Sequence, residues 1–320
     1  MAILIAHKVC MVTYLRDSEY FTEELREIAQ SLSNLFAGEF KVVICCSGSC
    51  SVNETDYDFP VELFHCAGTK FNRIFSFIRN DNSKFYLSID NDIKGNISAI
   101  KSFMSDMVQK SYDIGWGKIV SAKRNTLVSN LIAIDKLLSH YIIRPLLWKC
   151  RCGISVPGQI FCLKGESFRD HSFDFDTTLD DLAVGLYVAR HLVSRLQVNS
   201  ILGYETPNVS FGGLCAQRKR WACGYAAILS ATHDLTGKGL LLLHAFSYHF
   251  LWLFHWAVLF YLFHFGPLYS LAYMLFSSVI MTFHAPKFLV YGIVYQLIFP
   301  IFHLIWVIEM IKCSHNSLEG

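Results

Sequence analysis

Formal charge is almost absent from the C-terminal part of this 320-residue chain. Between Gly239 and Ile308 the only formally charged residue is Lys287. Three apolar segments fill this stretch, at about residues 240–265, 268–283 and 288–311. A membrane-spanning helix needs about 20 apolar residues, so the first and third segments are long enough and the second is marginal. We therefore predict two or three transmembrane helices over residues 239–312.

The sequence also lacks the features of several other protein classes. The formal net charge is only +2, and no basic stripe carries interleaved aromatic residues, so nucleic acid is not an expected partner. Eleven cysteines are scattered without a C-x-x-C pair, which argues against a disulfide framework or a zinc site of the usual spacing. We therefore expect the soluble part of the chain to face a reducing, cytosolic compartment.

Short apolar runs alternate with amphipathic stretches in the first ninety or so residues. The runs at residues 8–14, 40–45, 61–64 and 84–89 are rich in residues that favour buried strands. Residues 21–32, for which Asp17 and Ser18 offer caps, and residues 71–78 have the periodicity of helices. This order predicts an α/β fold with a parallel sheet covered by helices. Ligands of such sheets lie outside the carboxyl ends of the strands, where Thr13, Ser47 and Asp90 fall.

The rest of the polar part is predicted in less detail. The expected elements are a helix over 97–110, a strand at 120–122, a helical stretch over 127–148, a strand at 159–163, a helix over 180–191, a glycine-bearing loop over 207–214 and a helix over 217–231.

The first group with chemical potential is Asp90-Asn91-Asp92, at the end of the run 84–89. Two carboxylates one residue apart at a strand end can reach a divalent cation and a ribose together, and Mg²⁺ or Mn²⁺ prefers such oxygen ligands. The alternative is a surface turn with two solvated carboxylates.

A second acidic pair, Asp180-Asp181, opens the helix predicted over 180–191. One of these carboxylates can act as a general base while its neighbour sets the local field. The alternative is a plain helix cap, because aspartate accepts hydrogen bonds from the free backbone N–H groups of a first helical turn.

The third group, Gln217-Arg218-Lys219-Arg220-Trp221, stands just before the uncharged C-terminal part. Glutamine and arginine donate hydrogen bonds to phosphate oxygens, and a tryptophan face stacks on a sugar ring. The alternative is a juxtamembrane basic cluster that contacts anionic headgroups. Under either interpretation these cations, together with Lys238, place this side of the first span in the cytoplasm.

The order and spacing of the three groups identify a resemblance. The D-x-D at Asp90 and Asp92, the pair Asp180-Asp181 and the Q-x-x-R-W of Gln217, Arg220 and Trp221 precede membrane helices. The chain thereby resembles the membrane-integrated family 2 glycosyltransferases, which include cellulose, chitin and hyaluronan synthases and certain lipid glycosyltransferases. The resemblance covers about residues 8–229, and Q-x-x-R-W is its most specific part.

The resemblance implies a GT-A fold and an inverting, metal-dependent transfer from a nucleotide sugar, with a UDP-sugar expected. It implies metal binding by Asp92, with Asp90 nearer the nucleoside, and a general base at Asp181, with Asp180 in place of the usual glutamate. The remaining implied roles are donor binding by Thr13, Tyr14, Lys70, Gln217 and Arg220, and an acceptor-site floor at Trp221.

One departure concerns the donor base. The family usually has an aspartate after the second strand, where this chain has Cys45-Cys46-Ser47-Gly48-Ser49. The missing acid leaves the residue that reads the nucleotide base unassigned.

The expected organisation is a cytosolic GT-A domain over residues 1–212, an interfacial amphipathic helix over 213–238 and membrane helices over 239–312. The chain is thus expected to be an integral membrane enzyme that contacts membrane lipids. A growing polysaccharide is the leading expectation for the acceptor, because Q-x-x-R-W favours it, and a homo-oligomer is then expected because three spans enclose no polymer channel. The few spans favour a single transfer to a lipid or lipid-linked acceptor. A non-catalytic subunit of a synthase complex is the alternative of another class.

Overall fold

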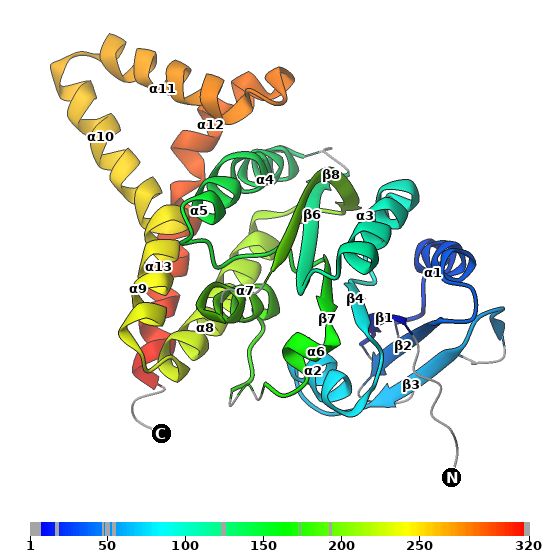
Figure 1. Ribbon diagram of the computed structural model, residues 1–320. Helices are drawn as coiled ribbons and strands as arrows, with labels where there is room; N and C mark the ends of the chain where they lie inside the picture. Colours follow the sequence, from blue (N-terminus) through cyan, green and yellow to red (C-terminus); the bar gives the residue numbers. More distant parts are fainter. Residues whose placement is uncertain are drawn as a thin grey trace. The chain divides into compact units, whose positions relative to one another are not determined.

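The computed structural model describes residues 8–16, 19–46, 48, 52, 56–122, 126–171, 173, 175–191 and 194–316 (Figure 1). The chain forms two compact units that interleave along the sequence. Unit 1 comprises Met1–Ile119, Val156–Asp181 and His191–Glu205, and unit 2 comprises Val120–Ser155, Leu182–Arg190 and Thr206–Gly320.

A mixed sheet organises unit 1. Its strands are β1 (Val9–Tyr14), β2 (Phe40–Cys46), β3 (Val61–His65), β4 (Phe85–Ile89), β5 (Ile93–Gly95), β6 (Ile114–Ser121), β7 (Ile160–Lys164) and β8 (Arg195–Glu205). Their spatial order is β3-β2-β1-β4-β7-β6-β8-β5. The strands β3, β2, β1 and β4 are parallel, with Val9 opposite both Phe40 and Phe85.

The parallel sheet expected from the first ninety or so residues is therefore confirmed, whereas β7, for which no direction was predicted, is antiparallel to both β4 and β6. An apolar run that is buried on both faces has the same composition in either direction, so the sequence of β7 could not reveal its orientation. The strand expected at 120–122 is the end of the longer β6. The sequence analysis missed β5 and β8, since β5 has three residues and β8 is largely polar and incompletely buried.

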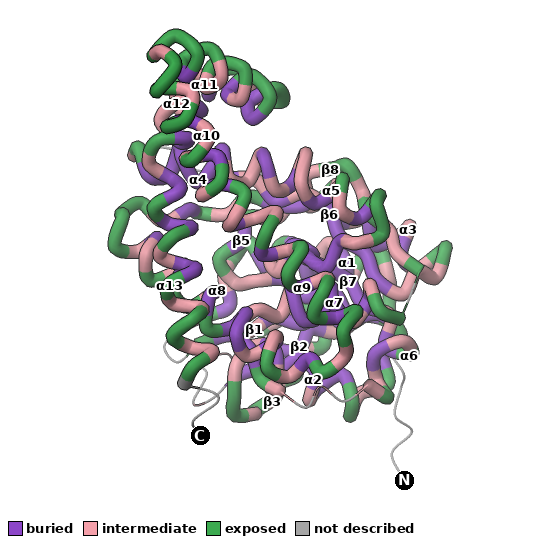
Figure 2. Tube along the Cα trace, turned by 90° about the vertical axis from the view of Figure 1, so that its left-hand side faces the viewer, coloured by how far each residue is buried: buried purple, intermediate pink, exposed green. Residues whose placement is uncertain are grey.

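Helices cover both faces of the parallel strands. These helices are α1 (Glu23–Leu35), α2 (Lys70–Asn80), α3 (Ile97–Lys110) and the short α6 (Gly165–Phe168). Leu25 and Ile28 of α1 join Phe103 of α3 in a core with Val9 and Met11, and the intervening Cys10 is also buried. Figure 2 shows the buried parts of the chain in purple. Burial on both faces explains why β1 and β4 read as continuous apolar runs rather than as alternating ones.

Local caps fix where two of these helices begin. The side chain of Thr22 accepts a hydrogen bond from the backbone N–H of Leu25, so Thr22 is the N-cap of α1. Asp17 and Ser18, which were expected to provide caps, lie outside the described residues, as does Ser47. Thr69 caps α2 in the same way by accepting from the backbone N–H of Asn72. The cap therefore determines that Lys70 is the first residue of its helix.

Unit 2 is helical. Its helices are α4 (Leu127–Leu137), η2 (Leu138–Ile143), α5 (Arg144–Lys149), most of α7 (Asp180–His191), α8 (Phe211–Ala231), α9 (Leu235–Ala245), η3 (Phe246–Phe250), α10 (Leu251–Phe265), α11 (Pro267–Thr282), η4 (Pro286–Phe288), α12 (Leu289–Ile298) and α13 (Pro300–Asn316). The loop predicted over 207–214 is wrong from Phe211 onward. Ser210 caps α8 by accepting from the backbone N–H of Gly213, which offsets the low helix propensity of the glycines in its first turn.

Two of the three apolar segments form helices long enough to cross a membrane, Leu235–Phe265 and Pro286–His315. The middle segment forms the shorter helix Pro267–Thr282. In the first helix only 22% of the apolar stretch is buried, and in the second 44% is buried. A core helix of a soluble protein is mostly buried. Length, composition and exposure therefore agree with a membrane-associated part of the chain.

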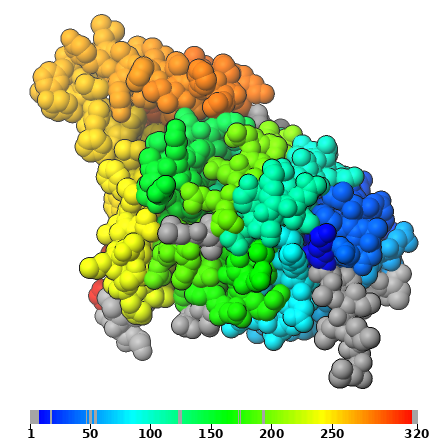
Figure 3. All heavy atoms as spheres, viewed as in Figure 1, coloured from blue at the N-terminus to red at the C-terminus, as the bar shows by residue number. Residues whose placement is uncertain are grey.

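Large apolar side chains are exposed along α10 and α11. The atoms of these helices are coloured yellow to orange in Figure 3. The exposed fractions reach 71% at Phe260 and Phe283 and 77% at Leu268. Contiguous apolar exposure on this scale is typical of a surface that contacts lipid or a partner rather than water.

A buried ion pair lies inside unit 2. The guanidinium of Arg218 on α8 donates to Asp135 of α4 over 2.6 Å, and the hydroxyl of Tyr295 on α12 donates to the same carboxylate over 2.9 Å. Burial opposes ionisation of Asp135, but the favourable interactions of the carboxylate, of which the charge of Arg218 is the largest, together outweigh burial and lower the pKa of the carboxyl group. This network therefore joins three helices that are far apart in the sequence.

Cys223 of α8 and Cys313 of α13 form a disulfide, with 90 residues between them in the sequence. The sequence analysis argued against a disulfide framework and did not predict this single pair. No local pattern indicates it, because the two residues become neighbours only when α8 and α13 pack together.

Candidate active site

A cation lies between two acidic side chains in unit 1. The Nζ of Lys70 is 2.6 Å from Oδ1 of Asp90 and 2.7 Å from Oδ2 of Asp180. Lys70 also donates to the backbone oxygen of Gly158 over 2.9 Å. The three side chains come from the start of α2, the carboxyl end of β4 and the start of α7. Three of the residues expected at the site are thus in direct contact.

The charged groups of this cluster shift one another's pKa values. Burial disfavours the ammonium of Lys70, but the carboxylates of Asp180 and Asp90 outweigh burial and raise the pKa of Lys70. Burial raises the pKa of Asp90, Lys70 lowers it, and the negative charge of Asp180 raises it again, to about 6. The single positive charge of Lys70 therefore does not neutralise both carboxylates.

Asp92 carries further negative charge near the same strand end. Burial and then the carboxylate of Glu205 raise the pKa of Asp92. Glu205 ends β8 opposite Ile93 of β5, and it accepts a hydrogen bond from the side chain of Gln159 over 2.6 Å. The edge of the sheet therefore holds an excess of carboxylate oxygens.

Asp181, the predicted general base, is partly exposed at the start of α7. A Cβ built on Gly158 would lie 3.1 Å from Cβ of Asp181 and 3.5 Å from Oδ1 of Asp180. The backbone of Gly158 thus approaches both members of the acidic pair, and its carbonyl binds Lys70 as well. A glycine at this position allows the close approach.

Thr13 and Tyr14 lie at the carboxyl end of β1, as expected. Thr13 is buried, and the guanidinium carbon of Arg73 lies 4.9 Å from the ring centroid of Tyr14. Arg73 is itself only 5% exposed, on α2 three residues after Lys70. The sequence analysis did not single out Arg73, which places a second cation near this strand end.

The third predicted group lies on α8 in unit 2. Gln217 and Trp221 are partly buried and Arg220 is exposed, whereas Arg218 is 4% exposed. The guanidinium carbon of Arg218 lies 4.7 Å from the centroid of the Trp221 ring. Arg218, which the motif leaves unspecified, therefore anchors α8 through Asp135 and packs against the motif tryptophan.

The residues that sequence analysis missed share one property. Gly158, Glu205, Arg73 and Asp135 belong to no local motif, and each acts through a residue distant in the sequence. Glu205 alone had a weak signal in the sequence. It directly precedes Thr206 and Pro207, and β8 ends at this point.

Comparison with known families decides the identity of the chain. The model of the family described as "Glycosyl transferase family group 2" matches residues 98–308, which is more than half of the sequence. The chain belongs to this family. It is a family 2 glycosyltransferase, and this agrees with the acidic cluster at the carboxyl end of β4. No curated protein matches its sequence.

Solved structures support the fold. The mannosyltransferase PcManGT from Pyrobaculum calidifontis, in complex with GDP-Man and Mn²⁺, is 14% identical, with a TM-score of 0.53 over 97% of this glycosyltransferase and 88% of that chain. A glucosyl-3-phosphoglycerate synthase from Mycobacterium tuberculosis is also 14% identical, over 72% of this chain and 82% of its own, but its TM-score of 0.48 is too low for an argument. The first likeness supports a GT-A-like α/β fold with a mixed sheet.

Proposed function

We propose that this glycosyltransferase moves a sugar, with inversion, from a nucleotide-sugar donor to an acceptor at the membrane. The observation that carries the proposal is the contact of Lys70 with Asp90 and Asp180 at the carboxyl end of β4. Ligands of open α/β sheets bind at such strand ends. In this proposal Asp181 accepts the proton of the acceptor hydroxyl as its oxygen attacks the anomeric carbon.

The acidic residues fit a divalent cation. Asp90 and Asp92 offer oxygen atoms only, which suits Mg²⁺ or Mn²⁺. The pKa values of both residues are raised first by burial and then by a neighbouring carboxylate, that of Asp180 at Asp90 and that of Glu205 at Asp92. Asp92 would hold the metal, with Asp90 nearer the nucleoside. When bound, such an ion neutralises the charge that develops on the departing diphosphate.

The other predicted residues receive roles from their chemistry. Lys70 orients Asp90 and Asp180 and provides positive charge for the donor. Gln217 and Arg220 would donate hydrogen bonds to the diphosphate, and Trp221 would form the floor of the acceptor site. Thr13 and Tyr14 would line the nucleoside side, where Arg73 packs on Tyr14.

The donor base stays open between uridine and guanosine. A UDP-sugar is expected from the resemblance, but Cys46 ends β2 near the position where the family has an acid. The structure of PcManGT contains GDP-Man, which makes a guanosine donor a necessary member of any test panel.

We propose a lipid or lipid-linked acceptor. Two helices of sufficient length and the exposed aromatic surface of α10 and α11 support a site beside a bilayer. The basic residues Lys219 and Arg220 before these helices favour a cytoplasmic position of the site. A growing polysaccharide is the second candidate, favoured by Q-x-x-R-W at Gln217–Trp221, and it requires an oligomer to enclose a channel.

Product analysis tests the proposal. Purified full-length chain in lipid is incubated with radiolabelled UDP- and GDP-sugars and with Mg²⁺ or Mn²⁺. We expect a single label that partitions into organic solvent. A high-molecular-weight product that a glycosidase degrades would establish the polysaccharide alternative. Absence of transfer from every donor, in a preparation that binds nucleotide, would favour a non-catalytic subunit.

Gly158→Ala is expected to lower kcat by about tenfold with little loss of stability, because displacement of a catalytic group by a fraction of an ångström has effects of this order. The added Cβ would lie 3.1 Å from Cβ of Asp181 and must displace it. Gly239→Ala is the matched control, since a Cβ there meets no atom within 4 Å. Equal rates of transfer for both variants would show that Gly158 does not position the acidic pair.

A further inference from the structure

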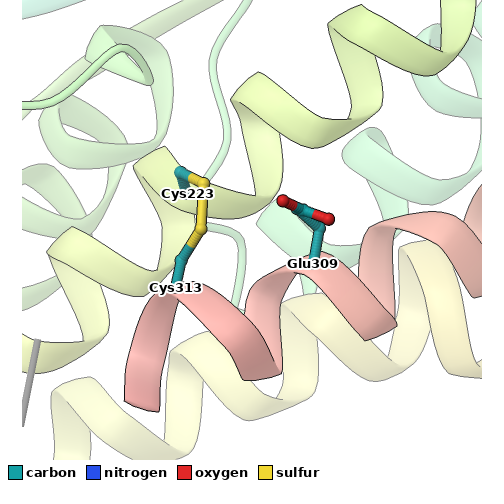
Figure 4. A group of neighbouring side chains, drawn as sticks. All are labelled: Cys223, Glu309 and Cys313. Carbon is teal, nitrogen blue, oxygen red and sulfur yellow. A yellow bond between two sulfur atoms is a disulfide. The ribbon is translucent and has the colours of Figure 1, made fainter. Parts of the chain in front are cut away.

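A cluster of potential metal ligands lies in unit 2, whereas the proposed catalytic residues belong to unit 1. It comprises Cys223 of α8 and Glu309 and Cys313 of α13 (Figure 4). One ligand atom from each residue lies within 4.8 Å of the other two. Glu309 and Cys313 are four residues apart on one helix, so successive turns present them on one face. The packing of α8 against α13 brings Cys223 to that face.

We propose that Cys223, Glu309 and Cys313 form a Zn²⁺ site when the two cysteines are reduced. Zinc binds thiolates at about 2.3 Å and carboxylate oxygens at about 2.0–2.2 Å, so ligand atoms around a tetrahedral ion are roughly 3.5 Å apart. The three ligand atoms lie within 4.8 Å of one another, which is close enough for this geometry once reduction separates the two sulfur atoms. Three protein ligands leave the fourth position to water, so the bound metal is exchangeable.

The carboxylate is available for this role. Glu309 is 23% exposed in its side chain, and its described ion pair is with Lys312, 3.6 Å away and 65% exposed. An exposed pair of this kind contributes at most about 1 kcal/mol and does not prevent metal binding. Two soft sulfur ligands favour zinc over Mg²⁺ or Mn²⁺, which prefer oxygen. The cluster therefore differs in chemistry from the carboxylates at Asp90 and Asp92.

The disulfide and the zinc site are two states of the same cysteines. A dithiol reductant supplies two electrons and two protons, becomes a disulfide itself and leaves thiols on Cys223 and Cys313. Zinc then displaces one proton from each thiol, and two Zn–S bonds form. A reducing compartment favours the thiol state, in which the metal replaces the covalent link between α8 and α13.

Metal analysis of the full-length chain in detergent tests the proposal. The protein is reduced with dithiothreitol, freed of it anaerobically, loaded with Zn²⁺ and gel-filtered. We expect the wild type to retain about one zinc per chain more than Cys223→Ser and Cys313→Ser. Cys215→Ser is the matched control, because Cys215 is a free cysteine on the same helix, and it should retain as much zinc as wild type. Equal zinc in Cys223→Ser and wild type would overturn the proposal.

Three further measurements exclude an effect of misfolding. Glu309→Gln keeps both cysteines and should weaken zinc binding by about tenfold or more, as removal of a ligating group does. Loading with Co²⁺ should give a thiolate charge-transfer band that Cys215→Ser keeps and Cys313→Ser loses. Unchanged zinc affinity in Glu309→Gln would reject the three-residue site. Equal zinc binding by the oxidised protein would reject it as well, because a disulfide offers no thiolate.

Discussion

Asp181→Asn is expected to lower kcat by about 10²–10⁴-fold, the usual contribution of a general base, while leaving donor binding nearly unchanged. An amide has nearly the same shape as a carboxylate but accepts no proton from the acceptor hydroxyl. The substitution leaves Asp90 and Asp180 in place, so the two ion pairs of Lys70 with these carboxylates should persist. Single-turnover transfer and equilibrium nucleotide binding, measured on the same preparation, separate the two effects.

Asp106→Asn is the control for this variant, since Asp106 forms a surface ion pair with Lys110 on α3. It should transfer sugar at the wild-type rate. If Asp181→Asn were as active as Asp106→Asn, Asp181 would not be the base, and the neighbouring Asp180 would be the next candidate.

Asp135→Ala is expected to destabilise unit 2 by about 3–5 kcal/mol, the usual effect of removing one partner from a buried ion pair. The substitution leaves the guanidinium of Arg218 only 4% exposed with its carboxylate gone, and it deprives the Tyr295 hydroxyl of its acceptor. Because the pKa of Asp135 is lowered, the ion pair stabilises the fold at every pH above the ordinary carboxyl pKa and is lost only as pH falls through the lowered value. Thermal unfolding in detergent at neutral pH measures the loss.

The matched comparison is Asp106→Ala, which removes the exposed partner of Lys110 and should change stability by at most about 1 kcal/mol. Combining Asp135→Ala with Arg218→Met should recover part of the stability, because no uncompensated charge then remains buried. An unfolding midpoint of Asp135→Ala equal to that of Asp106→Ala would show that the ion pair does not stabilise unit 2.

The elements that the sequence predicted well are those with a complete local signal. The strands β1, β2 and β4 are continuous apolar runs, and α3 has apolar residues at helical spacing and a capping Asn96. Asp90 lies at the end of its strand, and Asp180 and Asp181 open their helix, as expected. In each case the side chains that decide the structure lie within one element.

Other features required the whole fold. The antiparallel direction of β7 and the addition of β8 depend on pairing with distant strands, which the composition of a short run does not reveal. The sequence offered Lys70 as a basic residue near the donor, but only the fold places it between Asp90 and Asp180. Contacts within one helix or strand can be predicted because they follow the residue spacing of that element. Contacts between elements depend on how the elements pack.

By itself, the sequence determined the α/β character of the first part, the nearly uncharged helices of the last part and the three motifs that resemble family 2 glycosyltransferases. The tertiary structure alone decided that Arg218 rather than Arg220 is buried against Asp135, that Gly158 approaches Asp181 and that Cys223 meets Cys313. The physical reason is that burial and pairing are properties of the space between elements. A motif specifies which residues are present. Packing decides which of them are buried and paired and which remain exposed to solvent.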